Sequence, residues 1–304
     1  MNNILKNKNM GLLLAGSSII SFSAVFTRLS AASSSISAFY RVFFGALFLL
    51  VFCLIKKEKL WAGIPAFLYS ALAGLFFALD LFAWHRSINY IGPGLATVLS
   101  NFQVVFITFI TITIFKEKIN WKFYLSIFLA LIGIFLLCGV NWNGNTESYK
   151  TGVILGLVTA VFYTGYILAL NFSSKLENKL SPKSNIFWVC VSSTIFLGTI
   201  SKFSGESFSL ISNKNLIILL AYGILGQGVG WVFISSSMSS IPVSTAALIL
   251  LMQPVLSMTW DIIFFKRPTN IIDLIGFILS LGAIYLGATS RESENKNLTK
   301  TEEV

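Results

Sequence analysis

The chain alternates long apolar runs with short polar segments from one end to the other. A helix of about 18 or more apolar residues spans the ~30 Å hydrocarbon core of a bilayer, where helices and closed barrels satisfy every backbone polar group. The runs lack the alternating apolar and polar period of barrel strands. The pattern therefore predicts an all-α, polytopic membrane protein with ten transmembrane helices, at approximately residues 10–27, 36–55, 64–86, 92–115, 123–140, 151–171, 185–203, 214–236, 242–265 and 271–289.

Composition supports this class of protein. Hydrophobic residues make up 55% of the 304 positions and charged residues 11%, against roughly 25% charged residues in an average soluble domain. Cys53, Cys138 and Cys190 each lie in an apolar run, and we expect them to be small buried hydrophobic side chains. With one histidine and no metal-spaced cysteines, the sequence predicts neither a metal site nor a cofactor.

The basic residues indicate how the helices are oriented in the membrane. A net charge of +10 would suggest nucleic acid in a soluble protein, but here the basic residues lie between the apolar runs, so we expect lipid contacts and no nucleic acid. With a cytoplasmic N-terminus, fourteen of the 22 lysines and arginines fall in inner segments and seven in outer ones, and Arg41 falls within a run. The positive-inside rule then predicts both termini on the cytoplasmic side of a bacterial inner membrane, although Lys266 and Arg267 oppose it locally.

A gapless comparison at an offset of 150 residues indicates an internal repeat. Five helices per half is an odd number, so two such halves in series insert in opposite orientations, as in many secondary transporters. We predict two inverted five-helix repeats, residues 1–140 and 141–290, and a disordered polar tail at 291–304. The repeat needs the first run, so we expect that run to be kept rather than cleaved as a signal peptide. Segment 87–120 lies over 237–270, with identities that include Ser87 and Ser237, Ile91 and Ile241, Ala96 and Ala246, Gln103 and Gln253, Val105 and Val255, Lys116 and Lys266, and Asn120 and Asn270.

The repeated segments also carry a family resemblance. The stretch STAALILLMQPVLSMTWDIIFFKRP combines small residues, an apolar stretch, Pro-Val and a closing charged turn, and the residues that carry the pattern are Ala246, Ala247, Pro254 and Val255, with Ala96 and the 116–118 turn in the first half. Through these residues the chain resembles the EamA family of the drug/metabolite transporter superfamily. Val104 and Arg267 depart from it, standing where the family often has proline and glutamate. The resemblance covers nearly the whole chain and implies a five-plus-five helix architecture and transport of small metabolites, often export of amino acids.

Three ionisable side chains fall within the predicted spans, where a charge costs a few kcal/mol. They are Arg41, Asp80 and Asp261, and with this orientation all three lie in the outward-facing part of their helices. We predict an outer gate in which Arg41 pairs with a carboxylate when the outside is closed. An arginine in the second helix also fits the resemblance. The alternative is a permanent structural ion pair or simple snorkelling.

Polar and aromatic side chains within the spans are candidate substrate contacts. Asp80 and Trp84 are four residues apart and share a helix face, which suits a cationic or aromatic amine, unless Trp84 is an interfacial anchor. Gln103 and Gln253 are repeat-equivalent and are expected near the midplane, where inverted-repeat transporters bind substrate. The alternative role for such residues is interhelical hydrogen bonding. The remaining candidates are Asn101, Tyr163, Tyr166, Gln227 and Trp231.

Other features of the spans are expected to serve packing or anchoring. The glycine pairs Gly226 and Gly230, and Gly152 and Gly156, have the GxxxG spacing that allows close helix approach. His85 is expected at the outer membrane surface.

Together these features predict a secondary transporter that moves a small polar metabolite, an amino acid or related compound, by alternating access, and the resemblance favours export. The sequence has no GxxxxGK[ST] loop, so a substrate or ion gradient would drive transport. A receptor or structural membrane protein is one alternative, but it has no need of the repeat. A membrane-embedded enzyme is another, but the single histidine offers no catalytic cluster. Lipid-facing and partner-facing apolar surfaces look alike in sequence, so no oligomeric state is predicted.

Opposite insertion of the two halves can be tested at residues 120 and 270. A cysteine at Asn120 and a cysteine at Asn270, each in a chain whose three native cysteines are replaced by alanine, should react with a membrane-impermeant maleimide from opposite sides. Right-side-out and inside-out vesicles provide the two measurements. Labelling of both positions from the same side would contradict the inverted repeat.

Overall fold

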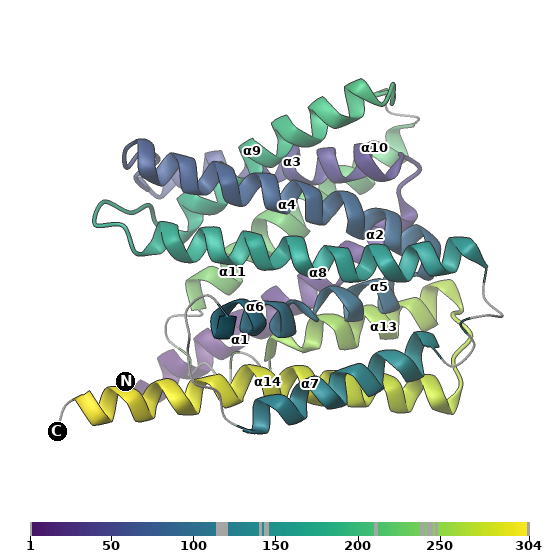
Figure 1. Cartoon of the computed structure of the whole chain (residues 1–304). Coiled ribbons are helices and arrows are strands. Elements are labelled where there is room, and N and C mark those ends of the chain that lie inside the picture. Colours follow the sequence, from purple (N-terminus) through teal and green to yellow (C-terminus); the bar gives the residue numbers. More distant parts are fainter. Residues whose placement is uncertain are drawn as a thin grey trace.

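A computed structural model of the chain consists of helices joined by short connections (Figure 1). It describes residues 2–113, 121–139, 142, 146–209, 212–237, 241, 246 and 249–302, and within these ranges the side chains of 2–7, 108, 111, 112, 123, 138, 139 and 287–302 are outside the description. No strand occurs in the described ranges. The helices are α1 (Asn2–Ser21), α2 (Ser23–Leu29), α3 (Ser34–Ile55), α4 (Ile64–Ile91), α5 (Pro93–Ser100), α6 (Gln103–Thr113), α7 (Trp121–Ile134), η1 (Phe135–Gly139), α8 (Glu147–Ser174), α9 (Pro182–Phe203), α10 (Asn213–Ala221), η3 (Tyr222–Val229), α11 (Gly230–Ser237), α13 (Met252–Phe265) and α14 (Ile271–Glu302).

Several of these helices are long and apolar enough to cross a membrane, which confirms the all-helical membrane class. Six stretches among the described residues meet both criteria: Lys8–Leu29, Ser34–Ile55, Ile64–Ile91, Glu147–Ser174, Pro182–Phe203 and Asn213–Ser237. Three shorter apolar helices accompany them: Pro93–Ile107, Tyr124–Leu137 and Ile271–Leu286. The protein is therefore an integral membrane protein.

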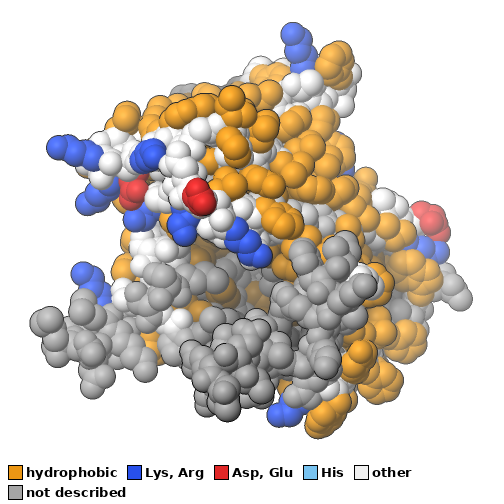
Figure 2. All heavy atoms as spheres, turned by 60° about the vertical axis from the view of Figure 1, so that its left-hand side comes forward, with side chains coloured by type: hydrophobic (Ala, Val, Ile, Leu, Met, Phe, Trp, Pro, Cys, Tyr) orange, Lys and Arg blue, Asp and Glu red, His pale blue; other side chains and the backbone are white. Residues whose placement is uncertain are grey.

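The axes of most helices are roughly aligned across Figure 1. Helix α1 begins at the end of the bundle where α14 finishes. The flank seen in Figure 2 is largely hydrophobic, whereas lysine and arginine side chains gather towards the end that comes forward. Exposed apolar side chains such as Ile55, Ile217 and Phe203 are suited to lipid. At the end with the two termini, the loops before α4 and α9 contact each other through Lys59 Nζ, which donates to Asn178 Oδ1 at 2.8 Å.

Three of the predicted spans are interrupted rather than continuous. The expected helix at 92–115 stops at Asn101, whose backbone N–H bonds Thr97 O and Val98 O in a tightened turn, and α6 then starts at Gln103. The Asn101 side chain also donates to Thr97 O at 2.8 Å, the local competition with helix bonding that asparagine favours. In the second half a turn at Leu251 precedes α13, at the same offset of 150 residues (251 − 101). The first span also turns, at Phe22 between α1 and α2.

The eighth predicted span contains a π-helical segment, η3, between α10 and α11. Glycines line this segment and bring it against its neighbours: a Cβ on Gly223 would lie 2.5 Å from Phe44 Cβ and 3.0 Å from Arg41 O. A Cβ on Gly226 or Gly230 would similarly collide with α2 or α1, which confirms the predicted close packing of that pair.

The C-terminal segment differs from expectation. Helix α14 continues to Glu302, so the prediction of disorder for 291–304 is wrong for the backbone as far as that residue. The reason lies in composition, because this polar stretch contains several glutamates and lysines and no glycine or proline, and such residues propagate a helix well.

The tight contact at Gly223 gives a stability prediction. Gly223→Val should lower the free energy of unfolding by about 1–3 kcal/mol, the usual cost of overpacking, because Phe44 and the α3 backbone leave no room for the side chain. Thermal unfolding of the purified protein in detergent measures this. Gly282→Ala is the control, since nothing lies within 4 Å of its Cβ position; an equal loss in both variants would contradict the packing explanation.

Candidate functional site

A cavity of about 380 Å³ lies inside the bundle, a volume that suits a small molecule. Helices from both halves of the chain contribute to its wall. The lining residues are Ile20, Ser21, Ser23, Arg41, Phe77, Asp80, Leu81, Trp84, Thr97, Ser100, Asn101, Gln103, Tyr163, Tyr166, Ile167, Leu170, Trp231, Ile234, Leu250, Gln253 and Ser257.

The structure brings most of the candidate substrate contacts together in this cavity. Eight of them line it: Asp80, Trp84, Asn101, Gln103, Tyr163, Tyr166, Trp231 and Gln253. The ninth, Gln227, is buried behind the wall and bonds Arg41. The interruption between α5 and α6 lies at the cavity, with Asn101 and Gln103 on either side of the turn.

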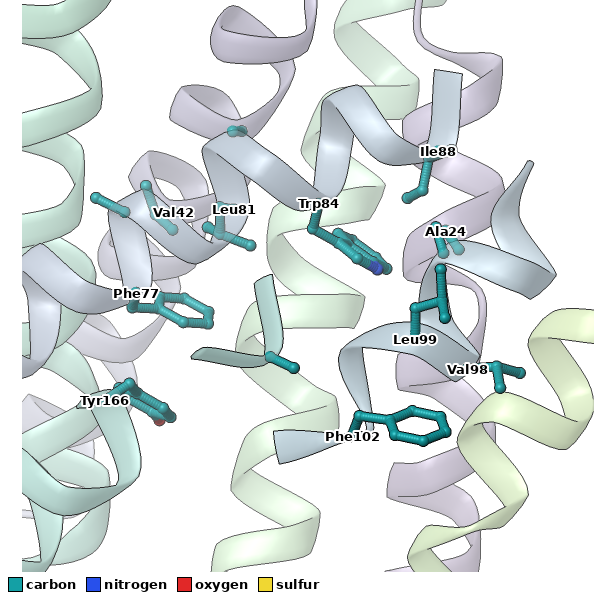
Figure 3. Close-up of a cluster of buried hydrophobic side chains, with 14 of the residues drawn as sticks. Ala24, Val42, Phe77, Leu81, Trp84, Ile88, Val98, Leu99, Phe102 and Tyr166 are labelled. Atoms are coloured by element: carbon teal, nitrogen blue, oxygen red, sulfur yellow. The ribbon is translucent and has the colours of Figure 1, made fainter. Parts of the chain in front are cut away.

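Asp80 is the carboxylate of the cavity. It is 5% exposed, and the described part of the chain supplies it with no hydrogen bond or ion pair. Helix spacing places Phe77 one turn before it and Trp84 one turn after it, and Figure 3 shows both rings among the buried side chains of α4. The ring of Tyr166 lies 5.0 Å from that of Phe77, between centroids. The carboxylate therefore adjoins an aromatic wall, which suits a cation.

Arg41 on α3 lines the same cavity and is also 5% exposed. Its Nε donates to Gln227 Oε1 at 3.0 Å, and its Nη1 donates to the Tyr222 hydroxyl at 3.0 Å. Its guanidinium carbon lies 5.5 Å from the Trp84 ring centroid and 5.1 Å from that of Tyr222. Among the described residues no carboxylate pairs with it within 4.0 Å, so the pairing expected of a gate is not formed in this conformation.

His85 and Tyr222 belong to this site, and sequence reasoning missed both. We expected His85 at the membrane surface, but its side chain is fully buried, with Nε2 3.1 Å from the Tyr222 hydroxyl and Nδ1 2.8 Å from Leu81 O. The prediction was wrong because α4 continues past this residue to Ile91. Nothing local to Tyr222 reveals its role, since its partners come from other helices.

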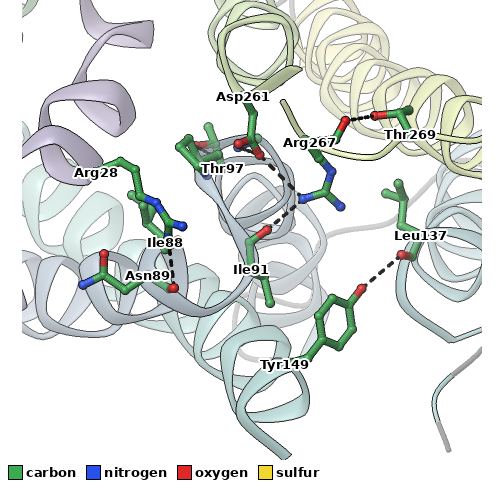
Figure 4. A network of polar contacts seen from close by, with 12 residues as sticks. Arg28, Ile88, Asn89, Ile91, Thr97, Leu137, Tyr149, Asp261, Arg267 and Thr269 are labelled. Carbon is green, nitrogen blue, oxygen red and sulfur yellow. Dashed lines mark hydrogen bonds and ion pairs between the residues drawn. The ribbon is translucent and has the colours of Figure 1, made fainter. Parts of the chain in front are cut away.

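A network of polar contacts surrounds the junction between α4 and α5 (Figure 4). Arg28 Nη1 donates to Ile88 O at 3.2 Å and to Asn89 O at 3.0 Å. Arg267 Nη1 donates to Ile91 O at 2.8 Å. The two arginines thus supply positive charge and donors to carbonyls at the C-terminal end of a helix, where both are favourable.

Asp261 belongs to this network and does not line the cavity of about 380 Å³; it lines a second cavity of about 680 Å³ beside the junction. Its Oδ2 accepts from the Gly94 backbone N–H at 3.0 Å, in the first turn of α5, and lies 3.6 Å from Arg267 Nη1. Gly92 has a φ of 86°, a left-handed conformation that glycine adopts readily. A Cβ on Gly92 would lie 2.6 Å from Asp261 Oδ2, and one on Gly94 would lie 2.6 Å from Met258 Sδ. These glycines allow α13 of the second half to contact the α4–α5 turn of the first.

Cys53 and Cys190 are buried and free, as predicted, whereas the Cys138 side chain is outside the described residues. In the described part of the chain, no group of three or more histidine, cysteine, aspartate or glutamate side chains is arranged to hold a metal.

Comparisons with known proteins indicate the family. A family model described as "EamA-like transporter family" matches residues 8–139 and 150–289. The chain is 21% identical over 209 residues to "Uncharacterized transporter YxxF" of Bacillus subtilis (strain 168), which covers 68% of this chain but only 62% of that protein. It is 24% identical over 261 residues to an "Uncharacterized transporter" of Clostridium kluyveri, covering 82% and 79% of the two chains. A solved structure shares the fold, with a TM-score of 0.64 and 14% identity over 93% of this chain and 96% of that one.

The contacts of Asp261 predict an effect on stability. Asp261→Ala should lower the free energy of unfolding by about 1–3 kcal/mol, because Gly94 N–H and Arg267 lose a buried acceptor. Thermal unfolding in detergent measures it. The control is Glu147→Ala, whose side chain is 88% exposed and pairs with Lys150; an exposed pair should be worth less than about 1 kcal/mol. Equal effects in the two variants would contradict a stabilising role for the contacts of Asp261.

Proposed function

Because the chain belongs to the EamA-like transporter family, and is thus a membrane transporter and not an enzyme, we propose that it is a secondary transporter for a small polar metabolite. The substrate is an amino acid or a related compound, and the direction is export across the cytoplasmic membrane of a bacterium. The observation that carries this proposal is the cavity lined by both halves, which holds the carboxylate of Asp80, an arginine and aromatic rings. A purely structural protein needs no such chamber.

The architecture we propose is ten transmembrane helices in two inverted five-helix repeats, with both termini cytoplasmic. Two observations support it. The family match falls in two segments of similar length, 8–139 and 150–289, and the helix interruptions at Asn101 and Leu251 occupy repeat-equivalent positions. Interrupted helices near the middle of the membrane are typical of the binding sites of inverted-repeat transporters, since their free backbone groups face the substrate.

Within the cavity, each candidate residue has a proposed role. Asp80 binds the cationic group of the substrate, and Trp84 contributes a cation–π contact. Asn101, Gln103 and Gln253 offer hydrogen bonds from the two interrupted helices. The apolar part of the substrate contacts the rings of Tyr163, Tyr166 and Trp231, and Gln227 orients Arg41.

Alternating access requires that one end closes while the other opens. We assign the closing contact in this conformation to Asp261, Arg267 and the Gly92–Gly94 turn, because they join the second half to the first. In the proposed topology this is the outer end, so the conformation faces inward. The outer closure that we propose therefore uses Asp261 and Arg267 in place of the pair between Arg41 and a carboxylate that the sequence predicts. Arg41 and Asp80 lie in the cavity beneath this closure.

Reconstitution in liposomes tests the proposal. Proteoliposomes loaded with each of the twenty L-amino acids in radiolabelled form should release at least one faster than protein-free liposomes do. Asp80→Asn should slow that release by about tenfold to a hundredfold, because a charged hydrogen bond contributes about 1.5–3 kcal/mol.

The matched control is Glu147→Gln, which changes an acid outside the cavity whose side chain is 88% exposed and should leave the rate unchanged. If no amino acid crosses faster than in protein-free liposomes, the proposed substrate class is wrong. If Glu147→Gln slows release as much as Asp80→Asn, the role given to Asp80 is wrong.

A further inference from the structure

A directional chain of hydrogen bonds fixes Arg41 from behind the cavity. His85 Nδ1 lies 2.8 Å from Leu81 O, which can only accept, so Nδ1 carries the proton and donates. In the neutral ring Nε2 is then an acceptor, and the Tyr222 hydroxyl 3.1 Å away donates to it. The oxygen of that hydroxyl accepts from Arg41 Nη1 at 3.0 Å and from the Thr27 hydroxyl at 2.9 Å.

The π-helical turn lets one segment hold Arg41 at two points. Tyr222 and Gln227, which both accept from Arg41, are five residues apart in η3. In an α-helix of 3.6 residues per turn, residues five apart project about 140° away from each other. A π-helix bonds residue i to i+5, so residues at that spacing lie on one face. Gly223 lets this face approach the α3 backbone at Arg41.

This arrangement leaves part of the guanidinium available. Arginine has five N–H donors, and the described bonds of Arg41 use Nε–H and one N–H of Nη1. The three others, two of them on Nη2, have no described acceptor, although the side chain is 5% exposed and lines the cavity. A planar fork of free N–H groups matches a carboxylate.

We infer that Tyr222 and His85 are positioning residues that hold Arg41 so that its free N–H groups bind the carboxylate of the substrate. The inference rests on the proposed function. It predicts that the site selects molecules with both a carboxylate, which Arg41 binds, and an ammonium group, which Asp80 binds. An amine that lacks the carboxylate leaves the Arg41 donors without an acceptor and binds more weakly.

Paired ligands test this selectivity. The unfolding midpoint of the detergent-purified full chain is measured against the concentration of L-phenylalanine and phenethylamine, L-tryptophan and tryptamine, L-leucine and isopentylamine, and L-lysine and cadaverine. For at least one pair, the acid should bind at least about tenfold more tightly than its amine. If no acid binds, or if each amine binds as tightly as its acid, the inference is overturned.

Variants then separate positioning from general stability. Tyr222→Phe and His85→Leu should weaken binding of the acid by about tenfold and leave binding of the amine unchanged, whereas His85→Gln, which restores an acceptor for Tyr222, should bind the acid almost as wild type does. The control is Tyr40→Phe, because that hydroxyl donates to Phe208 O at 2.7 Å and Tyr40 is not among the residues lining the cavity. Equal weakening of acid and amine in Tyr222→Phe, or the same selective loss in Tyr40→Phe, overturns the inference.

If Tyr222→Phe does not fold, His85→Leu and His85→Gln are compared instead. Weaker binding of the acid alone in His85→Leu, with nearly wild-type binding in His85→Gln, supports the inference, and equal weakening of acid and amine in His85→Leu overturns it. The liposome measurement separates the two proposals. Release of an amine in preference to its acid leaves the transporter proposal intact and overturns the inference. An acid that binds as expected but never crosses overturns the transporter proposal and supports the inference.

Discussion

A lipid bilayer offers no water to the polar groups of a helix bundle, so each group that turns inward needs a partner from the protein itself. Most of the buried polar groups described here meet this condition. The C-terminal carbonyls of α4 accept from Arg28 and Arg267, and a first-turn N–H of α5 donates to Asp261. The exceptions are informative, because an unpaired charge in such surroundings is costly and persists where it has a use.

Two ionisable side chains of this kind line the same cavity. Asp80 has no hydrogen bond or ion pair within the described residues, and Arg41 keeps free donors although Tyr222 and Gln227 hold it. The junction between α4 and α5 differs, since Asp261 accepts from the Gly94 backbone N–H and lies 3.6 Å from Arg267 Nη1, which itself donates to Ile91 O. The same constraint therefore produces a structural contact at one place and a candidate binding site at another, and the difference lies in how many partners surround the charge.

Three departures from regular helix geometry lie at the cavity or next to it. The turns at Asn101 and Leu251 and the π-helical segment at 222–229 all lie in spans that an apolar pattern presents as uninterrupted. Each one changes which side chains share a face, and η3 in particular aligns two residues that an α-helix would separate. Glycines in η3 and at the junction between α4 and α5 replace side-chain volume with close contact, which brings α3, α13 and η3 close to their neighbours.

The sequence by itself determined the membrane class, the family and the candidate residues that local spacing reveals. Asp80 and Trp84 share a face because they are four residues apart, and Gln103 and Gln253 are marked by the repeat. Hydrophobicity along a chain indicates which residues contact lipid or the protein interior. It does not indicate which helices pack against each other. Only the tertiary structure joined His85 to Tyr222 across 137 residues and Gly94 to Asp261 across 167. Those contacts depend on helix breaks and on packing between distant segments. The interactions that stabilise them come from residues far away in the sequence, which the local hydrophobic pattern does not reveal.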